Sequence, residues 1–387
     1  LCMTAVFILA TVGIAGGIIA DQTTKSWVEK AIGRDTVVIA HQEMCNQYKL
    51  LLSKFYETKE DLQFNYSDER YSIAEEFLNR LSSITGITKI DERLVLEMTV
   101  KEVQGIILGK TTSETIRVGD QREGESLIVG VKPAKVVGEW FLEGEFLKND
   151  QVTEAVIGDT LALKMFSVPL KQKIRMFMND FDIIGVCLDP INNGNVTYVP
   201  LKPLQNITGV SKPNVVVVKI APSVDNAGIL NQISAEVKKL NPEFEVLALN
   251  EVLDKNLSFL GHVWSTIMFL PLFSLFAASL CLICYVMLTI TEQRQEFGVL
   301  RALGAKPGTV INIVSGQSLV ILLSSFAVGI AFGIIITLLI LVPKPYVTSY
   351  TVVEIAGWLL TALAATFVLS LYPALRFAKK PLLEIMT

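Results

Sequence analysis

Histidine is scarce in this 387-residue chain, which has only His41 and His262. Metal centres and hydrolytic triads are usually built around histidine together with clustered carboxylates or a nucleophile. Neither histidine has such a cluster near it in the sequence, so we expect no metal site and no catalytic site. We expect His41 to lie in a loop and His262 to lie at a membrane edge.

Cysteine is also sparse, with five residues. Cys2, Cys281 and Cys284 fall in apolar runs, where cysteine acts as a small apolar packing residue. The C-x-x-C spacing of the last two has no further ligands around it, so it predicts neither a redox site nor a metal site. Cys45 and Cys187 lie in the charged part of the chain and could pair if that part is outside the cell.

Charged residues are missing from residues 1–20 and sparse after residue 262. Residues 21–262 hold 27 Lys and Arg against 34 Asp and Glu, whereas the residues after 262 hold 7 against 4. An acidic block without a basic patch excludes a nucleic-acid-binding protein, because phosphates must be neutralised by clustered cations. About 240 residues are enough for one large domain or two small ones.

Long apolar runs predict four membrane-spanning helices, in agreement with a mean hydropathy of +0.47. They are residues 1–20, 263–290, 310–342 and 352–371. About 20 apolar residues at about 1.5 Å each cross a hydrocarbon core of roughly 30 Å. A cleaved signal peptide is the alternative for the first run, but Ile18-Ile19-Ala20 is a poor cleavage site.

Basic residues in the short loops predict how the chain crosses the membrane. Three lie between the second and third spans and three follow the fourth, namely Arg294, Arg301, Lys306, Arg376, Lys379 and Lys380. By the positive-inside rule we expect residues 21–262 to be extracytoplasmic and both termini to be cytoplasmic, in a cell membrane. Glu354, at the outer edge of the fourth span, is expected to reach the interface. Because the chain starts at Leu1 without a Met, we also expect missing sequence before it, with room for a fused ATPase.

A charged segment, residues 291–309, separates the second and third spans. Each ionisable group in hydrocarbon costs about 2.5 to 3.5 kcal/mol, so this segment must leave the bilayer. Apolar residues recur in it at helical spacing, and charged residues mark the other side. The apolar positions are Phe297, Leu300 and Leu303 with Gly304, and the charged ones are Arg294, Glu296 and Arg301. An apolar stripe on an aqueous surface predicts docking on a soluble partner.

Residues 296–305 read E-F-G-V-L-R-A-L-G-A. This segment resembles the coupling segment of MacB/FtsX/LolC-type ABC transporter permeases, in which R-E-I-G-[IV]-L-R-A-[LI]-G-A is typical. Glu296 and residues 298–305 match that pattern. Residues 371–386 also resemble the ending of the family, near Y-P-A-x-R-A-A-x-x-x-P-x-E-A-L, with mild departures at residues 375–377 and at Met386.

The acidic block shows two strand–helix–strand patterns and a strand-rich part between them. The expected strands are residues 36–40, 87–90, 126–131, 174–178, 181–188, 196–199, 215–220 and 244–249, and the expected helices are residues 44–57, 71–81 and 225–240. We expect a split α/β part over about residues 21–111 and 211–262, with a β-rich insert over about residues 112–210. The order of these stretches also resembles the extracytoplasmic domain of the family.

Two glycine pairs lie in the predicted spans, Gly13 with Gly17 and Gly329 with Gly333. In each pair, three residues separate the glycines, which puts both on one face of a helix. Small residues at this spacing let helices approach closely in lipid. We expect at least one of these pairs to pack helices together.

Two further motifs predict little. The stretch Gly105–Thr111 resembles a phosphate-binding loop, but it has three residues between its glycines where four are required, so the chain has no ATPase of its own. Four N-x-[ST] sequons, at Asn65, Asn195, Asn206 and Asn256, leave glycosylation open.

Together these features predict an α-helical membrane protein with four transmembrane helices plus a large α+β extracytoplasmic domain. The resemblance implies a permease subunit that is not itself an enzyme. It would form a dimer with a second copy or a paralogue and bind two copies of an ABC ATPase, which would hold ATP and Mg²⁺. ATP-driven closure of the ATPases would then move the outer domains to export or extract lipoproteins, peptides or amphipathic compounds. The alternative is a transducer that transports nothing and activates an extracytoplasmic partner such as a cell-wall hydrolase.

Overall fold

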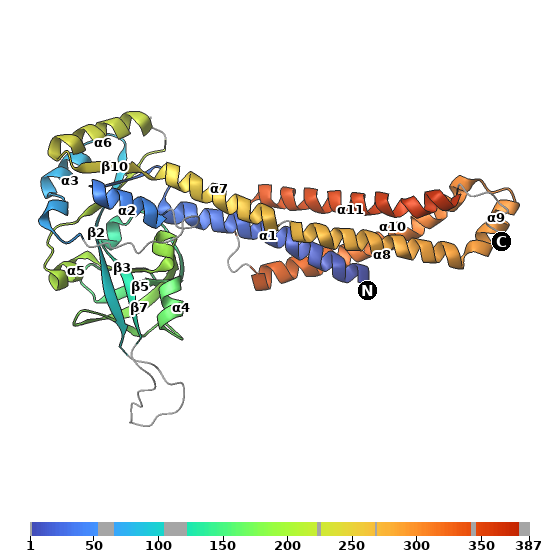
Figure 1. Cartoon of the computed structure of the whole chain (residues 1–387), viewed down its shortest axis with the longest axis horizontal. Helices are drawn as coiled ribbons and strands as arrows, with labels where there is room; N and C mark the ends of the chain where they lie inside the picture. Colours follow the sequence, from blue (N-terminus) through green and yellow to red (C-terminus); the bar gives the residue numbers. More distant parts are fainter. Residues whose placement is uncertain are drawn as a thin grey trace, which may run out of the picture. The chain divides into compact units, whose positions relative to one another are not determined.

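The computed structural model describes residues 2–52, 66–103, 122–222, 226–267, 269–341 and 346–378 (Figure 1). The chain divides into two compact units. The helical unit comprises the residues up to Lys25 and those from Leu260 onward, and the sheet unit comprises Ser26–Phe259.

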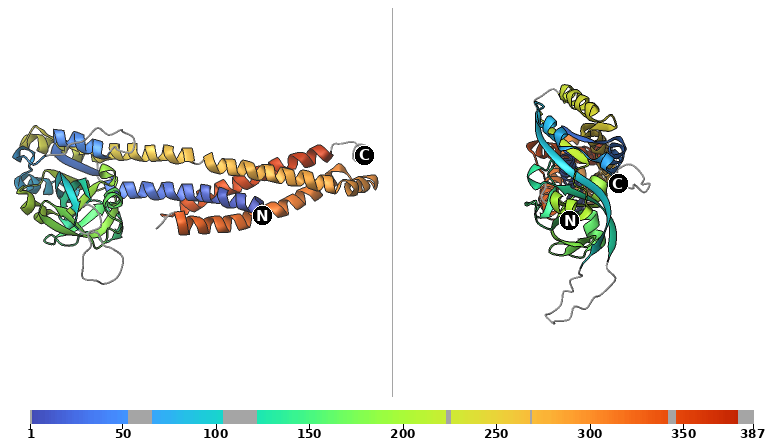
Figure 2. Two further views of the ribbon diagram at one scale, coloured as in Figure 1. Left: turned by 60° about the horizontal axis from the view of Figure 1, so that its bottom comes forward. Right: turned by 90° about the vertical axis from the view of Figure 1, so that its left-hand side faces the viewer.

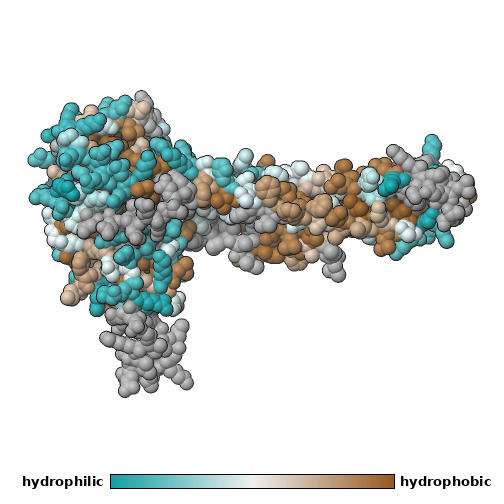
Figure 3. Space-filling view, viewed as in Figure 1, coloured by the Kyte–Doolittle hydropathy of each residue, from teal (hydrophilic) through white to brown (hydrophobic). Residues whose placement is uncertain are grey.

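Long helices make up the helical unit. They are α1 (Cys2–Ile32), α8 (Phe269–Glu292), α10 (Pro307–Ile336) and α11 (Ser349–Ala378), with the short helix α9 (Arg294–Ala302) between α8 and α10 and a π-helical stretch (Thr337–Leu341) after α10. Within the described residues, four stretches are long and apolar enough to cross a membrane: Met3–Ile32, Leu249–Glu292, Gly308–Leu339 and Ser349–Pro373. Hydrophobic surface gathers over α8, α10 and α11 (Figure 3), as expected for helices that face lipid.

The first of these helices is longer than the sequence predicts. It continues past Ala20 to Ile32, where Gly33 with φ +85° follows it. The charged residues Asp21 and Lys25 do not end the helix, because they pair with each other at 2.7 Å across one turn. The helix before α8 likewise starts earlier than predicted, since α7 spans Leu249–Ile267.

Ten strands of the described residues form a single sheet in the sheet unit. They are β1 (Thr36–His41), β2 (Ile87–Glu102), β3 (Glu123–Val131), β4 (Phe141–Gly144), β5 (Glu154–Gly158), β6 (Lys173–Met176), β7 (Asn179–Leu188), β8 (Val196–Pro200), β9 (Val215–Ile220) and β10 (Phe244–Ala248). The order is β10-β1-β9-β2-β3-β8-β5-β7-β4, and β6 pairs with β2 and β7.

The split α/β part and the β-rich insert therefore share one sheet, which sequence patterns did not predict. The 16-residue strand β2 joins them, because it pairs with β9 near its start and with β3 and β6 further on (Figure 2). The sequence pattern predicts a strand that ends at Ile90, before the charged residues Asp91, Glu92 and Arg93. In the structure these three charged side chains are buried within β2.

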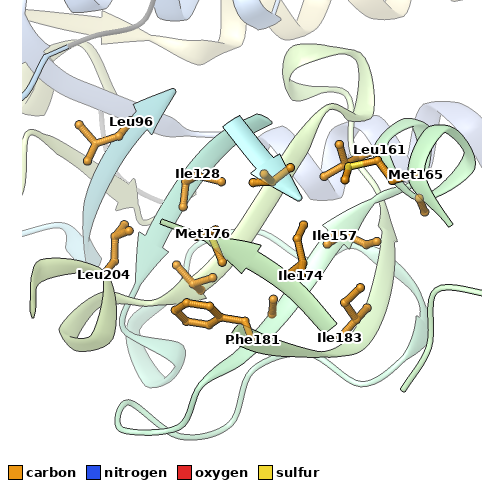
Figure 4. Close-up of a cluster of buried hydrophobic side chains, with 14 of the residues drawn as sticks. Leu96, Ile128, Ile157, Leu161, Met165, Ile174, Met176, Phe181, Ile183 and Leu204 are labelled. Carbon is orange, nitrogen blue, oxygen red and sulfur yellow. The ribbon is translucent and has the colours of Figure 1, made fainter. Parts of the chain in front are cut away.

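Each half of the sheet has its own apolar core. Helices α3 (Glu75–Ser82) and α6 (Asn226–Leu240) contribute Phe77, Leu81 and Ile233 to the core over β1 and β9. Helices α4 (Asp159–Met165) and α5 (Leu201–Thr208) cover the insert with Leu161, Met165 and Leu204 (Figure 4). Helix α2 (Gln42–Leu52) packs on β1 and β10.

His41 is not a loop residue, contrary to the sequence-based expectation. It is the last residue of β1 and is buried, with its ring edge-to-face against Tyr71 at 4.9 Å between centroids. Its Nε2 lies 3.3 Å from Oε2 of Glu243. Tyr71 belongs to a short 3₁₀ turn, so the predicted helix begins only at Glu75.

The cysteines of the sheet unit are buried free thiols rather than a disulfide. The Sγ of Cys45 donates to the backbone oxygen of Ala40 at 3.5 Å. Burial raises the pKa of Cys45 to about 12 and raises the pKa of Cys187 well above its usual value. Both thiols are therefore packing groups at neutral pH.

The sequons differ in access. Asn256 is fully buried on α7 and donates from Nδ2 to the backbone oxygen of Leu52 at 2.8 Å, so it has no room for a glycan. The Oδ1 of Asn195 is buried, and Thr197 of the same sequon is buried in β8. Asn206 is exposed on α5. Asn65 and the stretch Gly105–Thr111 lie outside the described residues.

Candidate coupling surface

Helix α9 is a separate short helix between α8 and α10. The helical path continues into it, because the N–H of Gln293 donates to the oxygen of Thr289 at 3.0 Å and the N–H of Phe297 donates to the oxygen of Gln293 at 3.0 Å. Helix α10 then begins after Lys306 with Pro307 in its first turn, where a missing N–H costs nothing. Residues 294–302 are thus fixed as a helix by the two long helices on either side.

Phe297 attaches α9 to the rest of the helical unit. Its side chain is 2% exposed. It packs in a small apolar cluster with Val286 and Ile290 of α8 and Val310 and Val314 of α10. The prediction that Phe297 faces a partner is therefore wrong, because this side chain is used inside the chain.

Gly304 ends α9. Its φ of +96° is in the left-handed region, which favours glycine. The N–H of Gly304 donates to the oxygen of Arg301 at 3.1 Å, and the N–H of Ala305 donates to the oxygen of Leu300 at 3.1 Å. These two bonds form a Schellman motif, which satisfies the last carbonyl groups of a helix. The conformation of the backbone thus accounts for Gly304 as the residue that ends the helix.

The outward face of α9 carries three exposed apolar side chains. Val299 is 56% exposed, Leu300 37% and Leu303 83%. Glu296 is exposed and falls on the same face, since it precedes these residues by three, four and seven positions. The structure thus revises the predicted pattern, which put Glu296 on the side opposite the leucines. We call Glu296, Val299, Leu300 and Leu303 the α9 face.

Val299 was missed by the sequence-based prediction. A stripe drawn through Phe297, Leu300 and Leu303 excludes it, although it precedes Leu303 by four residues and so shares its face. Arg294 and Arg301 are half-buried, seven residues apart, on the side of α9 that carries Phe297.

The glycine pairs lie at close helix contacts within the helical unit. A Cβ at Gly13 would lie 2.5 Å from Cγ of Pro271 in α8. A Cβ at Gly329 would lie 2.5 Å from Cβ of Phe7, and one at Gly333 would lie 2.6 Å from Cβ of Thr11, both in α1. Gly17 is buried in α1.

Among the described residues there is no group of three or more His, Cys, Asp or Glu that could hold a metal ion. The α9 face has no nucleophile beside a base either, so its chemistry suits binding rather than catalysis.

Family models match most of the chain. Residues 7–236 match the MacB-like periplasmic core domain, and residues 268–382 match the FtsX-like permease C-terminal. The chain belongs to the FtsX-like ABC transporter permeases with a MacB-like periplasmic core domain. The α9 face lies inside the FtsX-like part of this permease.

Similar proteins of known name include a permease and two solved domains. This chain is 25% identical over 193 residues to an uncharacterized ABC transporter permease, YvrN, of Bacillus subtilis strain 168. The aligned residues cover 48% of this chain and 47% of the relative. The chain thus spans about half the length of the curated relative it matches. The periplasmic region of MacB from Actinobacillus actinomycetemcomitans aligns at 17% identity over 56% of this chain and 89% of its own, with a TM-score of 0.38. The extracellular domain of the ABC-type transporter YknZ from Gram-positive bacteria aligns at 16% identity over 48% and 97%, with a TM-score of 0.35.

Proposed function

We propose that this permease is the membrane-spanning subunit of an ABC complex and that the α9 face binds a separate ATPase. The observation that carries the proposal is the exposed apolar trio Val299, Leu300 and Leu303 on a helix that is fixed to two long apolar helices. Exposed apolar side chains around a charged group are typical of a protein contact. A groove on the ATPase would cover the trio and place a hydrogen-bond donor opposite Glu296.

The attachment of α9 supports a role in transmitting motion. Because Phe297 is packed between α8 and α10, a displacement of α9 moves both helices with it. Helices α1 and α7 each cross the boundary between the two units, so movements of the helical unit can pass into the sheet unit through continuous helices. ATP and Mg²⁺ would be bound by the ATPase.

The basic residues around α9 and after the fourth span support a cytoplasmic α9 face and an extracytoplasmic sheet unit. In this arrangement a pair of permeases with two ATPases would move its outer domains to export or extract lipoproteins, peptides or amphipathic compounds.

Binding of the ATPase tests the proposal directly. Leu303→Asp puts an unpaired charge where we expect an apolar groove, which costs several kcal/mol, on the order of 3 or more. The permease co-expressed with its cognate ATPase should lose co-purification, while hydrogen exchange of the sheet unit stays unchanged.

The matched control is Thr309→Asp, which adds the same charge at an exposed position in the first turn of α10, outside the α9 face. This variant should still bind the ATPase. If Leu303→Asp binds as well as the control does, the α9 face is not the coupling surface.

A further inference from the structure

The helical unit contains an apolar cavity between α1, α10 and α11. Its volume is about 640 Å³, and all of its lining residues belong to the helical unit. They include Ala15 and Ile19 of α1, Ile330 of α10, and Ala356 and Leu359 of α11. A volume of this size falls within the roughly 300–1,000 Å³ of pockets that hold small organic ligands.

The described residues of the cavity wall offer a ligand no polar contact. Thr337 is the one lining residue with a polar side chain, and its Oγ1 donates to the backbone oxygen of Gly333 at 2.9 Å. An occupant must therefore present hydrocarbon to the wall.

Polar side chains gather at one end of the cavity. Gln22 follows Ile19 by one turn of α1, and Thr351 and Glu354 flank the lining residues Val352 and Ile355 of α11. The Nε2 of Gln22 donates to Oε2 of Glu354 at 3.2 Å, and the Oγ1 of Thr351 donates to Oε1 of Gln22. We call Gln22, Thr351 and Glu354 the polar mouth.

Glu354 is the informative member of the polar mouth. It is a half-buried carboxylate in the candidate span Ser349–Pro373. Ionisable groups in membrane spans are costly and are usually functional. Gln22 supplies a neutral donor rather than a cation, and among the described residues, which do not include 342–345, Glu354 forms no ion pair.

We propose that this cavity binds a single-chain cationic amphiphile, with its alkyl chain in the apolar cavity and an ammonium head group at Glu354. The apolar wall accepts the chain, and the carboxylate accepts charge-assisted hydrogen bonds from the head group. An anionic head group is repelled by the same carboxylate. The proposal does not depend on the α9 face, because it requires neither an ATPase nor movement of α9.

Binding of simple amphiphiles to the full chain tests the site. The permease is placed in phosphatidylcholine nanodiscs, which lack primary amines, and saturable binding of radiolabelled dodecylamine is measured against empty nanodiscs. Dodecyl sulfate provides the same chain with an anionic head group, and dodecanol provides it without charge. We expect dodecylamine to bind at least about tenfold more tightly than dodecyl sulfate, since one charge-assisted hydrogen bond is worth about a factor of ten or more.

Three variants locate the site. Glu354→Gln should weaken dodecylamine binding by about tenfold and leave dodecanol binding unchanged. Ala356→Trp fills the cavity and should remove the binding of both. Val353→Trp is the matched control, since Val353 is on the same helix, is 69% exposed and does not line the cavity.

The results that overturn the proposal are equally specific. Equal affinity for the amine and the sulfate, or no effect of Glu354→Gln, would mean that the cavity holds any bilayer acyl chain without selecting its head group. Equal effects of Ala356→Trp and Val353→Trp would place the binding elsewhere, and an absence of saturable binding would reject the site altogether.

Discussion

Gly329 and Gly333 bring α10 against α1, whereas the sheet unit carries a fully buried ion pair within β2. In the sheet unit, Nη2 of Arg93 lies 2.7 Å from Oδ2 of Asp91, and both side chains are at most 4% exposed. Val137 completes the network, because its N–H donates to Asp91 at 2.9 Å and its oxygen accepts from Arg93 at 2.7 Å. Helix packing in the helical unit thus depends on residues without a side chain, whereas the buried charges of the sheet unit depend on their ion-pair and hydrogen-bond partners.

This difference predicts which substitutions each unit tolerates. Helices in lipid gain no hydrophobic driving force from association, so backbone approach at small residues supplies much of the contact. A sheet in water gains stability from its apolar cores, and a charge buried among them must keep its partner. Adding one methyl group should therefore damage the helical unit, and removing one charge should damage the sheet unit.

The largest effect is expected for Arg93→Met. Removal of the guanidinium leaves the carboxylate of Asp91 buried without its charge partner, which costs about 3–5 kcal/mol. Hydrogen exchange of the full chain should show loss of protection throughout the sheet unit, with α8, α10 and α11 unchanged.

The matched control is Arg175→Met. Nε of Arg175 lies 2.6 Å from Oδ1 of Asp180, but both side chains are partly exposed. This pair is screened by water, so its loss should leave protection unchanged. Equal protection in both variants would show that the buried pair does not hold the sheet unit together.

A pH-dependent effect comes next in size, at Asp189 in the sheet unit. Burial raises the pKa of Asp189 to about 6, although Tyr198 Oη at 2.6 Å and the N–H of Ile191 at 2.8 Å donate to its carboxylate. The folded state therefore binds a proton more tightly than the unfolded state. The free energy of unfolding should fall as pH rises from about 4 through 6, by about 3 kcal/mol at most.

Asp189→Asn should abolish this contribution, whereas Asp182→Asn, at an exposed carboxylate, should leave it in place. The measurement is hydrogen exchange of β8 at pH 4.5 and pH 7, corrected for the intrinsic exchange rate. Identical pH dependence in Asp189→Asn and the unsubstituted chain would contradict the prediction.

Gly329→Ala is the converse test in the helical unit. The new methyl group would meet Cβ of Phe7 at 2.5 Å, so α1 and α10 must separate, at a cost of about 1–3 kcal/mol. Gly316→Ala on the same helix meets nothing within 4 Å and should gain up to about 1 kcal/mol from helix propensity. In detergent, the midpoint of thermal unfolding should be lower for Gly329→Ala and higher for Gly316→Ala than for the parent chain. If both midpoints change in the same direction, close contact at Gly329 does not stabilise the helical unit.

Local patterns in the sequence predict much of this architecture. The strand expected over Val215–Ile220 is β9 with the same bounds, and the four apolar runs correspond to four helices. The single sheet was not predictable, because it depends on pairing between β2 and strands far away in the sequence. Charged residues 91–93 read as the end of a strand, and only tertiary contacts allow them to be buried.

The coupling segment shows the same limit at a smaller scale. Helical spacing predicts that 297, 300 and 303 are apolar positions of a helix, but it does not distinguish an apolar side chain used within the chain from one left for a partner. Phe297 is of the first kind, whereas Leu303 is 83% exposed and we propose that it is of the second kind. The distinction depends on the positions of α8 and α10 beside α9. Helical periodicity carries no information about those positions.

The smallest expected effect distinguishes a glycine that is required by its positive φ from a glycine that is required by close helix contact. Gly304 has open space around a Cβ, unlike Gly329, but its φ is +96°. Gly304→Ala should therefore cost about 1 kcal/mol through backbone strain alone and should fray the last turn of α9, including Leu303. Hydrogen exchange of α9 should increase several-fold and ATPase binding should weaken slightly. Gly308→Ala, also in open space but without a positive φ, should change neither. If both variants behave alike, the Schellman motif does not hold the α9 face in place.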